Sequence, residues 1–396
     1  MYVPSGSLND ESIPVALNEP VPRTESGSES HVEGPVTIIG VGLMGGSLGL
    51  ALRARQPALD VVGWDDAPAL QAALERGAIT RAATSLADAV ATARLIVLAT
   101  PVATALDVLS EMAPDLASGV LVTDLGSVKR PVAQHAEEVL PPGVTFIGGH
   151  PMAGSERTGV RHADALLFEN ATWVLCPAPR DADSTPYRSM VTFVELTGAR
   201  VLPMTADEHD AIAARVSHLP QLLSVLLVNL ASESRAAHPD LLDLAAGGFR
   251  DMTRIAGSRF SMWRDIIDAN RGEIQDVLAA FARHLQALRG ALAEDDMVRV
   301  ADRFRDAEQT RDFIPSDRKG FLRPLSDVYV FVGDEPGALV RITSCLFDAR
   351  INIKDIELLR IREGTGGTFR LGLETPAEAQ RAVDALGQHG ITAYRL

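Results

Sequence analysis

Short apolar runs alternate with helical patterns over residues 35–179, and no other feature constrains the fold as strongly. The runs read VTIIG, VVGWD, LIVLAT, VLVTDLG and VTFIGG, and turn residues bound them. Such runs are typical of parallel strands that are buried on both faces of a sheet. Ala/Leu-rich stretches with helical spacing lie between them, for example at residues 46–55 and 67–76. This alternation predicts an α/β domain built on a Rossmann-type, doubly wound sheet.

The next part of the chain has a different pattern. Strand patterns disappear over residues 186–307, where long Ala/Leu segments such as 218–233 and 266–292 predict an all-helical domain. Its apolar content is high for surface helices, which favours burial of some faces against a second copy of the chain. Residues 308–325 are polar and contain Pro and Gly, so they predict a linker.

The C-terminal part, residues 326–396, forms a third pattern. It predicts the order β-α-β-β-α-β, which is the ferredoxin-like order. The expected strands cover residues 327–332, 351–362, 368–374 and 391–396, and the expected helices cover residues 337–349 and 376–388.

The first 34 residues hold six acidic side chains against a single arginine, with many Ser, Pro and Gly residues. This composition is typical of a disordered acidic tail. The expected organisation is therefore a tail over residues 1–34, a dinucleotide-binding domain over 35–185, a helical substrate and dimerisation domain over 186–307, a linker over 308–325 and a small domain over 326–396.

Composition excludes several classes of protein. The chain has 37 Lys plus Arg and 52 Asp plus Glu, a formal net charge of −15, which repels nucleic-acid backbones and anionic membrane surfaces. No uninterrupted apolar run approaches the ~20 residues of a membrane span, and no secretory signal is present, so we expect a cytoplasmic protein. Cys176 and Cys345 have no zinc-ligand spacing, and we expect free buried thiols.

A GxGxxG motif, Gly40 to Gly45, follows the first predicted strand and opens a helix at about Leu43. In that context the glycines allow a tight turn and close approach of backbone N–H groups to a pyrophosphate. Asp65 ends the second strand, where a carboxylate would accept hydrogen bonds from a ribose. Two carboxylates, Asp65 and Asp66, would repel a 2′-phosphate, which favours NAD over NADP. The alternative is a turn in which the glycines serve packing alone.

Two further segments should reach the carboxyl edge of the sheet, where ligands bind in open α/β folds. One contains Thr100 and Pro101, and the other contains Ser127, which either binds substrate and nicotinamide or caps a helix. The predicted cofactor contacts are Gly40, Gly42, Leu43, Met44, Gly45, Asp65, Thr100, Pro101 and Ser127. His150 lies between a glycine pair and a proline at the end of the next strand. An imidazole there can accept a proton near neutral pH, so His150 is the predicted catalytic base.

The helical region carries a second group of polar residues. Arg250 and Arg254 lie on a Gly-rich segment with Asp251 between them. Arginine can hold a carboxylate through two parallel hydrogen bonds, so the segment predicts anion binding, although an ion pair between Asp251 and one arginine is the alternative. His209 and His218 are nine residues apart without a carboxylate motif, and we expect no metal site.

Taken in order, the motifs GVGLMGGS, LATP, DLGSVK, GGHPMAGSE, SHLPQ, GGFRDMTRIA and MWRD resemble prephenate dehydrogenases, the TyrA family of tyrosine biosynthesis. The resemblance covers residues 36–307. The terminal segment, with DEPGAL and INI, resembles an ACT domain, a type of domain that binds amino acids as feedback ligands.

The family resemblance implies NAD-dependent oxidative decarboxylation of prephenate to 4-hydroxyphenylpyruvate. His150 would accept a hydrogen bond from the ring hydroxyl as hydride leaves the same carbon, and Ser127 would orient that histidine, the hydroxyl and the nicotinamide. Arg254 would bind a substrate carboxylate, and Lys129 could add positive charge. The other residues expected at the substrate pocket are Arg250, Ser155, Glu156, His218, Gln221 and Trp263, the last on a segment that in the family reaches the dimer partner's site.

Substrate choice depends on Gln221, because some family members carry a histidine at this place. An arogenate-specific enzyme should offer a carboxylate to the substrate ammonium. Gln221 is neutral and Asp251 is expected to be engaged by an arginine, which favours prephenate; arogenate dehydrogenase is the alternative.

Two further classes compete with this interpretation. A 3-hydroxy-acid dehydrogenase would rely on a lysine in the helical domain, and residues 186–307 contain none. An amino-acid-sensing regulator with an inactive dehydrogenase body would not need Ser127, His150 and Arg254 together.

Feedback regulation by tyrosine is expected at the ACT-like unit, between paired domains, where DEPGAL opens a helix whose N–H groups can hold a carboxylate. The expected contacts are Asp334, Pro336, Gly337, Ala338, Leu339 and Asn352. The alternative is a unit that only stabilises the oligomer.

Overall fold

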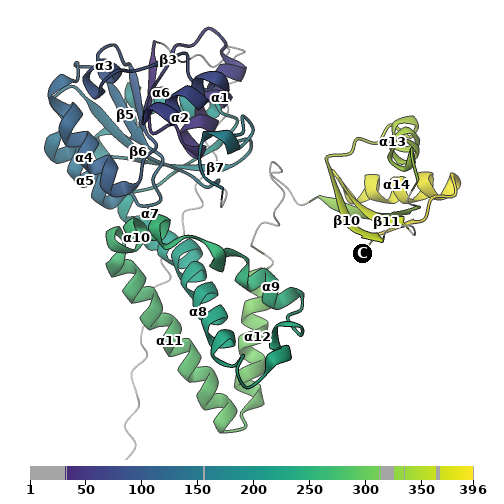
Figure 1. Cartoon of the computed structure of the whole chain (residues 1–396). Coiled ribbons are helices and arrows are strands. Elements are labelled where there is room, and N and C mark those ends of the chain that lie inside the picture. Colours follow the sequence, from purple (N-terminus) through teal and green to yellow (C-terminus); the bar gives the residue numbers. More distant parts are fainter. Residues whose placement is uncertain are drawn as a thin grey trace, which may run out of the picture.

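The structure, a computed structural model, describes residues 34–154, 157–311, 325–333, 335–362 and 366–395, together with Val32 and Phe313. The expected tail and most of the expected linker lie outside the described residues. Figure 1 shows the sheet region, the helical region and the small C-terminal region in turn along the chain.

The N-terminal region contains a sheet with the strand order β3-β2-β1-β4-β5-β6-β7-β8. All neighbouring strands are parallel except β6 and β7, which are antiparallel. The strands are β1 (Val36–Ile39), β2 (Val61–Trp64), β3 (Arg81–Ala82), β4 (Leu95–Leu98), β5 (Leu121–Asp124), β6 (Thr145–Pro151), β7 (Thr172–Pro177) and β8 (Arg200–Pro203). The five apolar runs named above therefore form strands, as the alternation predicts.

Helices cover both faces of this sheet. They are α1 (Leu43–Arg55), α2 (Ala67–Glu75), α3 (Leu86–Val90), α4 (Val102–Met112), α5 (Arg130–Val139) and α6 (Thr185–Leu196). One core contains Leu48 of α1 and Phe193 of α6, and the other contains Leu109 of α4 and Val132 of α5. The doubly wound architecture is confirmed, and each face of the sheet has its own apolar core.

The predicted domain boundary at residue 185 is wrong. Helix α6 packs in the first core, and β8 pairs with β7 through Thr172–Arg200 to Leu175–Pro203, so the sheet region continues to Pro203. Three strands lie outside the five predicted runs: β3, which has only two residues, and the strands β7 and β8 at the other end of the sheet. Strands β7 and β8 both depend on pairing beyond the parallel part of the sheet, which alternation with helices does not reveal.

The following region is helical. It contains α7 (Ala206–Ala213), α8 (Leu219–Glu233), α9 (Gly247–Thr253), α10 (Phe260–Ala269), α11 (Arg271–Ala293) and α12 (Met297–Arg311). The predicted helix over residues 266–292 is divided at Asn270 into α10 and α11. Helix α12 occupies the first residues of the expected linker, which is thus shorter than predicted.

Helix α7, a π-helical turn (Ala214–His218) and α8 form one continuous helix of 28 residues, Ala206–Glu233, which is long and apolar enough to cross a membrane by length and composition alone. The helix reaches this length although none of its uninterrupted apolar runs approaches ~20 residues. Buried polar side chains interrupt the apolar pattern at His209, Asp210 and His218, and they hydrogen-bond to other parts of the chain.

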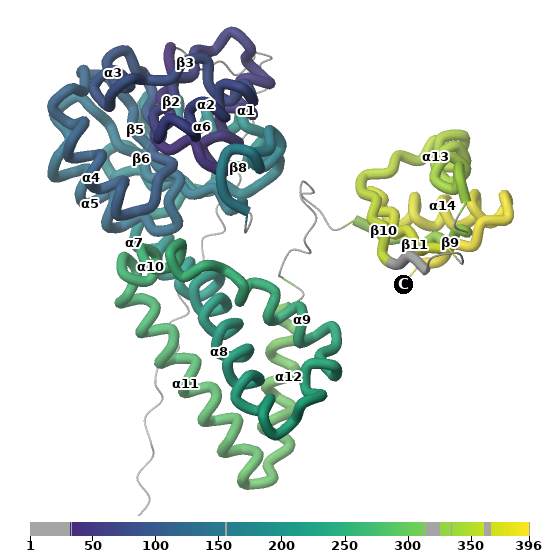
Figure 2. Tube along the Cα trace, in the orientation of Figure 1, coloured from purple at the N-terminus to yellow at the C-terminus, as the bar shows by residue number. Residues whose placement is uncertain are grey.

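Helix α7 contacts β7 and α5, and α10 contacts α4, so these two helices join the helical region to the sheet region. Figure 2 shows α7 and α10 at this junction, with α8 and α11 extending away from it. The junction brings α7 to β7, the antiparallel partner of the strand β6 that carries His150.

The C-terminal region is a four-stranded antiparallel sheet with the order β10-β11-β9-β12. Its elements follow the order β9 (Ser326–Val332), α13 (Ala338–Asp348), β10 (Asp355–Arg362), β11 (Gly366–Leu373), α14 (Pro376–Gln388) and β12 (Ala393–Tyr394). Cys345 lies in its core, and both Cys345 and Cys176 are buried and free, as expected.

Candidate active site

The glycine loop lies between β1 and α1, as predicted. Gly40 has φ +92°, which L-residues with a Cβ rarely adopt, and a Cβ at Gly45 would lie 2.0 Å from the carbonyl oxygen of Gly40. By contrast, a Cβ at Gly42 would meet nothing within 4 Å. Packing therefore explains the first and third glycines but not the second. Gly42 is also the N-cap of α1 and no side chain caps the helix, so its first N–H groups are available to a phosphate.

Asp65 and Asp66 have different roles. The Val41 backbone N–H, in the glycine loop, donates to Asp65 Oδ2 at 2.8 Å. Asp66 caps α2, and its Oδ1 accepts from the Ala69 N–H at 2.8 Å. Only Asp65 is thus bonded to the loop, and the residues present fit the adenosine and pyrophosphate parts of NAD. Repulsion of a 2′-phosphate therefore depends mainly on Asp65, because Asp66 is used as a helix cap.

The ends of β4 and β5 lie at the same edge of the sheet. Thr100 follows β4, and its buried Oγ1 has no hydrogen-bond partner among the described residues. Ser127 follows β5 but does not cap α5, whose N-cap is Lys129. The helix-cap interpretation of Ser127 is therefore wrong.

Lys129 is fully buried and forms an ion pair with Asp124. Its Nζ also donates to the Gly149 carbonyl at 2.6 Å, and Asp124 Oδ1 accepts from the Gly149 N–H at 3.1 Å. Asp124 and the Gly149 carbonyl bind the Lys129 ammonium group inside the protein. The expectation that Lys129 supplies a cation to the substrate is therefore wrong. The pair instead holds the backbone just before His150.

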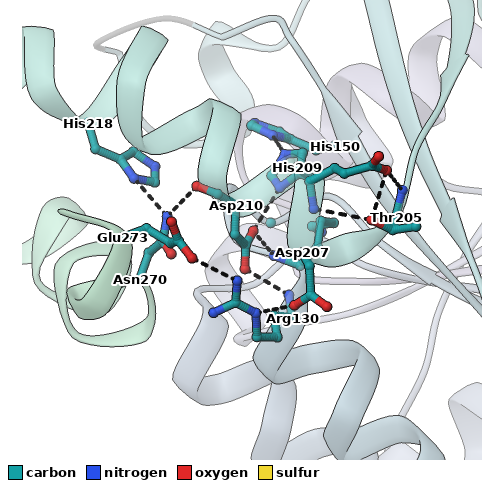
Figure 3. A network of polar contacts seen from close by, with 12 residues as sticks. Arg130, His150, Thr205, Asp207, His209, Asp210, His218, Asn270 and Glu273 are labelled. Atoms are coloured by element: carbon teal, nitrogen blue, oxygen red, sulfur yellow. Dashed lines mark hydrogen bonds and ion pairs between the residues drawn. The ribbon is translucent and has the colours of Figure 1, made fainter. Parts of the chain in front are cut away.

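His150 lies near the end of β6 and contacts the helical region. Its Nδ1 is 2.8 Å from Nε2 of His209 on α7, and His209 Nδ1 is 2.8 Å from Asp210 Oδ1. Figure 3 shows the three side chains in one chain of hydrogen bonds. Burial lowers the pKa of His150 well below its usual value, and the positive charge of Lys129 lowers it further. His150 is therefore neutral near pH 7 and can accept a proton.

Asp210 connects this histidine pair to the start of α5. Its carboxylate accepts the backbone N–H of Lys129 at 2.8 Å and that of Arg130 at 2.9 Å. Burial opposes ionisation of Asp210, but the hydrogen bonds from His209 and from these two N–H groups lower its pKa overall. The loop that carries Ser127 is therefore bound to the helix that contacts His150.

His218 and Trp263 form the neighbouring contact. Their rings are 5.9 Å apart in a T-shaped arrangement, and Asn270 Nδ2 lies 3.2 Å from His218 Nδ1 (Figure 3). Burial lowers the pKa of His218 to about 4. Nε2 of His218 and Nε1 of Trp263 are buried without a hydrogen-bond partner among the described residues.

The arginine segment is more open. Arg250 is on α9, its Nε donates to the Ala245 carbonyl at 3.0 Å, and Arg254 opens a 3-10 turn (Arg254–Gly257); both side chains are exposed. Gln221 Nε2 donates to the Ile255 carbonyl at 3.0 Å and so ties this turn to α8. Within the described part of the chain, Asp251 forms no ion pair with either arginine, so the expected pairing is wrong.

Some predicted site residues cannot be placed. Ser155, Glu156 and Asp334 lie outside the described residues. In the C-terminal region, Gly337, Ala338 and Leu339 line a cavity of about 290 Å³ together with residues of β9, β10 and β11, whereas Pro336 and Asn352 do not line it.

His209 and Asp210 were not predicted as site residues. The sequence pattern presents His209 only as a possible metal ligand. The local signal was a capping box at Thr205 and Glu208, which begins α7 and sets which residues of the helix face inward. Their hydrogen bonds to His150 and Lys129 depend on the packing of α7 against the sheet.

A glycine loop at a helix N-terminus and a neutral histidine at the carboxyl edge of the same sheet define a dinucleotide-dependent dehydrogenase. Two family models match the chain: the nucleotide-binding domain of prephenate dehydrogenase over residues 48–203 and its dimerization domain over residues 205–306. The chain belongs to the prephenate dehydrogenase family.

Individual relatives agree with this assignment. The chain is 35% identical to the prephenate dehydrogenase of Bacillus subtilis over 356 residues, which cover 89% of this chain and 95% of the relative. The solved prephenate dehydrogenase of Aquifex aeolicus, in complex with hydroxyphenyl propionate and NAD+, has a TM-score of 0.66 and 29% identity, covering 72% of this chain and 99% of that one. The Synechocystis arogenate dehydrogenase has a TM-score of 0.62 and 28% identity, covering 70% and 99%.

Proposed function

We propose that this chain catalyses the NAD-dependent oxidative decarboxylation of prephenate to 4-hydroxyphenylpyruvate in tyrosine biosynthesis. The observation that carries the proposal is His150, a neutral imidazole at the sheet edge where the dinucleotide loop lies. The name of the Bacillus subtilis relative and the bound compounds of the Aquifex aeolicus structure support the substrate class and the cofactor.

In this reaction His150 accepts the hydrogen bond of the ring hydroxyl, and Ser127 orients the histidine and the hydroxyl. The glycine loop and Asp65 would hold NAD, which would supply the acceptor for the hydride that leaves the same ring carbon. Loss of carbon dioxide then restores aromaticity, so the protein has mainly to position the reacting groups. Arg254 binds a substrate carboxylate, and Gln221 holds the turn on which Arg254 lies.

The remaining predicted contacts form the pocket wall in this proposal. Arg250 adds a second cation near the substrate, and His218 and Trp263 contribute a rigid aromatic surface. Ser155 and Glu156 retain their proposed place at the pocket entrance from the family resemblance.

Arogenate is the second candidate substrate. Asp251 is exposed and forms no ion pair with Arg250 or Arg254 among the described residues, so a carboxylate is available on this segment for an ammonium group. The similarity to the Synechocystis arogenate dehydrogenase points in the same direction.

The test is the initial rate of NADH or NADPH formation with prephenate and with arogenate, each with NAD and with NADP. We expect the highest rate with prephenate and NAD, and a loss of about 10²–10⁴-fold in kcat for His150→Asn. A higher rate with arogenate would make arogenate the substrate, and it would indicate that Asp251 binds the ammonium group of arogenate. No rate with any pair would favour the alternative of a sensor with an inactive dehydrogenase body.

We also propose that residues 326–396 form an ACT domain that binds tyrosine as a feedback effector. The cavity beside Gly337, Ala338 and Leu339 supports this proposal, because the left-handed Gly337 precedes α13 and its first N–H groups. Asp334 stays part of the proposed site, whereas Pro336 and Asn352 do not line this cavity. Calorimetry of the full-length chain with tyrosine should give saturable heat, and Gly337→Val should abolish it; no heat in the wild-type chain would contradict the proposal.

The domain organisation and assembly complete the proposal. Most of the expected acidic tail, residues 1–34, and most of the expected linker, residues 308–325, lie outside the described residues; the chain is proposed to act as a homodimer in the cytoplasm. The dimerization-domain match over residues 205–306 supports the dimer.

A further inference from the structure

We propose that His209 and Asp210 are positioning residues that fix the tautomer of His150, so that its Nε2 is free to accept the substrate proton. The inference rests on the proposed reaction at His150. It follows from the hydrogen bonds that connect these three side chains and from the number of protons available to them.

These hydrogen bonds form a relay from Asp210 through His209 to His150. The relay begins at Asp210, a carboxylate with no proton to donate. Asp210 is 1% exposed, and its two oxygen atoms accept the N–H groups of Lys129 and Arg130. These hydrogen bonds, with the one to His209, keep the carboxylate ionised. A carboxylate only accepts hydrogen bonds, so the proton between Asp210 and His209 lies on Nδ1 of His209.

The same reasoning applies at the next contact. In the proposed arrangement this proton is the only one on the His209 ring, so that its Nε2 presents a lone pair. The 2.8 Å contact between His209 Nε2 and His150 Nδ1 then requires the proton to lie on His150 Nδ1. Because His150 is neutral, its Nε2 carries no proton and can accept one.

The relay also holds the site in place. His209 is 3% exposed, and its ring lies at 71° to the ring of His150 with centroids 5.0 Å apart. Asp210 at the same time anchors the start of α5, next to Ser127 and Lys129. One buried carboxylate therefore sets both the proton on the base and the position of the loop that carries Ser127.

Protonation of the base is also assisted. When His150 Nε2 takes up the hydroxyl proton, the imidazolium still donates from Nδ1 to His209, and the negative charge of Asp210 lies beyond His209. A charge that forms on His150 is thus met by a preorganised acceptor.

The experiment compares His209→Gln with His209→Leu in the full chain. The amide oxygen of Gln can accept the proton on His150 Nδ1, whereas Leu cannot. We expect kcat with prephenate and NAD to fall by about 100-fold in His209→Leu and to recover at least tenfold of this loss in His209→Gln, with both KM values within about twofold of wild type. His135→Leu, at a histidine on α5 that contacts Ser110, is the matched control and should leave kcat unchanged.

A second measurement does not depend on turnover. Nitrogen-15 NMR of the histidine rings should show His150 protonated at Nδ1 in wild type and in His209→Gln, and a mixture of both tautomers in His209→Leu. Equal kcat in the Gln and Leu variants, or an unchanged His150 tautomer in His209→Leu, would overturn the inference. If the wild-type chain turns over no prephenate, the proposed function fails, and the NMR comparison still decides the role of His209.

Discussion

The sheet region and the helical region bury their apolar side chains to very different degrees. Both faces of the sheet are covered by helices of the same chain, and side chains such as Leu48 and Leu109 are fully buried. In the helical region many large apolar side chains are exposed, among them Leu226 at 55%, Leu230 at 62% and Phe260 at 69%. The sheet region therefore completes its core by itself, whereas the helical region has faces that fit a second copy of the chain.

The charged side chains of the two regions also differ in burial and in pairing. In the sheet region Lys129 and Asp124 form a buried pair with all their charge used inside the protein. In the helical region Arg250 and Arg254 are exposed. The charges of the buried pair neutralise each other within the folded chain, whereas the two exposed arginines are accessible to an anionic ligand. Four predictions test this contrast.

The largest effect is expected at the buried pair. Lys129→Met leaves the Asp124 carboxylate buried without its cation and should lower the free energy of unfolding by about 3–5 kcal/mol. Arg180→Met removes an arginine from an exposed pair with Glu137 and should cost less than about 1 kcal/mol. Urea denaturation of both variants measures the two losses in free energy of unfolding. Equal losses would show that the Lys129–Asp124 pair contributes no more than an exposed ion pair.

The pH dependence tests the buried histidine of the helical region. The unfolded chain protonates His218 near pH 6.5, whereas the folded protein protonates it at about pH 4, so unfolding takes up a proton between these values. The free energy of unfolding should fall by roughly 3 kcal/mol from this group as the pH falls through the window. The depressed pKa of His150 acts in the same direction.

Denaturation at several pH values measures this slope. His218→Gln should reduce this slope by the amount that corresponds to about one proton taken up on unfolding, while His135→Leu should leave the slope unchanged. A wild-type protein equally stable at both ends of the window would contradict the assigned burial of His218.

The open arginine segment should affect substrate binding and leave stability unchanged. Arg254→Ala removes a charged hydrogen-bonding group and should lower kcat/KM for prephenate by about 100-fold, with the KM for NAD unaltered. Arg305→Ala, on α12 in an exposed pair with Asp302, is the control. Comparable losses in the two variants would argue that the effect is one of general charge and not of a binding site.

The smallest effect is expected at the exposed apolar face. Leu230→Ala on α8 should raise the dimer dissociation constant by about tenfold, because a side chain buried between two copies is shortened. Leu166, which is 65% exposed in the sheet region, gives a matched control, and Leu166→Ala should leave association unchanged. Sedimentation of dilute protein distinguishes the two, and the reverse ranking would place the interface on the sheet region.

Local patterns in the sequence were sufficient where the structure depends on neighbouring residues. Apolar runs located β1, β2, β4, β5 and β6, and the GxGxxG motif located the glycine loop, where Gly40 has a positive φ. The helix predicted over residues 376–388 has these bounds in the structure, because Thr375 caps it and a proline begins it. Such signals act within a few residues and can be recognised in a single sequence.

The other features depended on contacts between distant segments. The antiparallel pairing of β6 with β7 extended the sheet to β8 and moved the domain boundary from residue 185 to Pro203. Burial turned Lys129 from an expected substrate contact into the partner of Asp124. The Asp210 carboxylate reaches the N–H of Lys129, 81 residues earlier in the chain, and His209 reaches His150 across 59 residues. The sequence by itself determined five strands of the sheet, the glycine loop and the place of His150 at the end of a strand; only the tertiary structure decided the partners of His150, because buried polar groups must find hydrogen bonds wherever the packed chain places them.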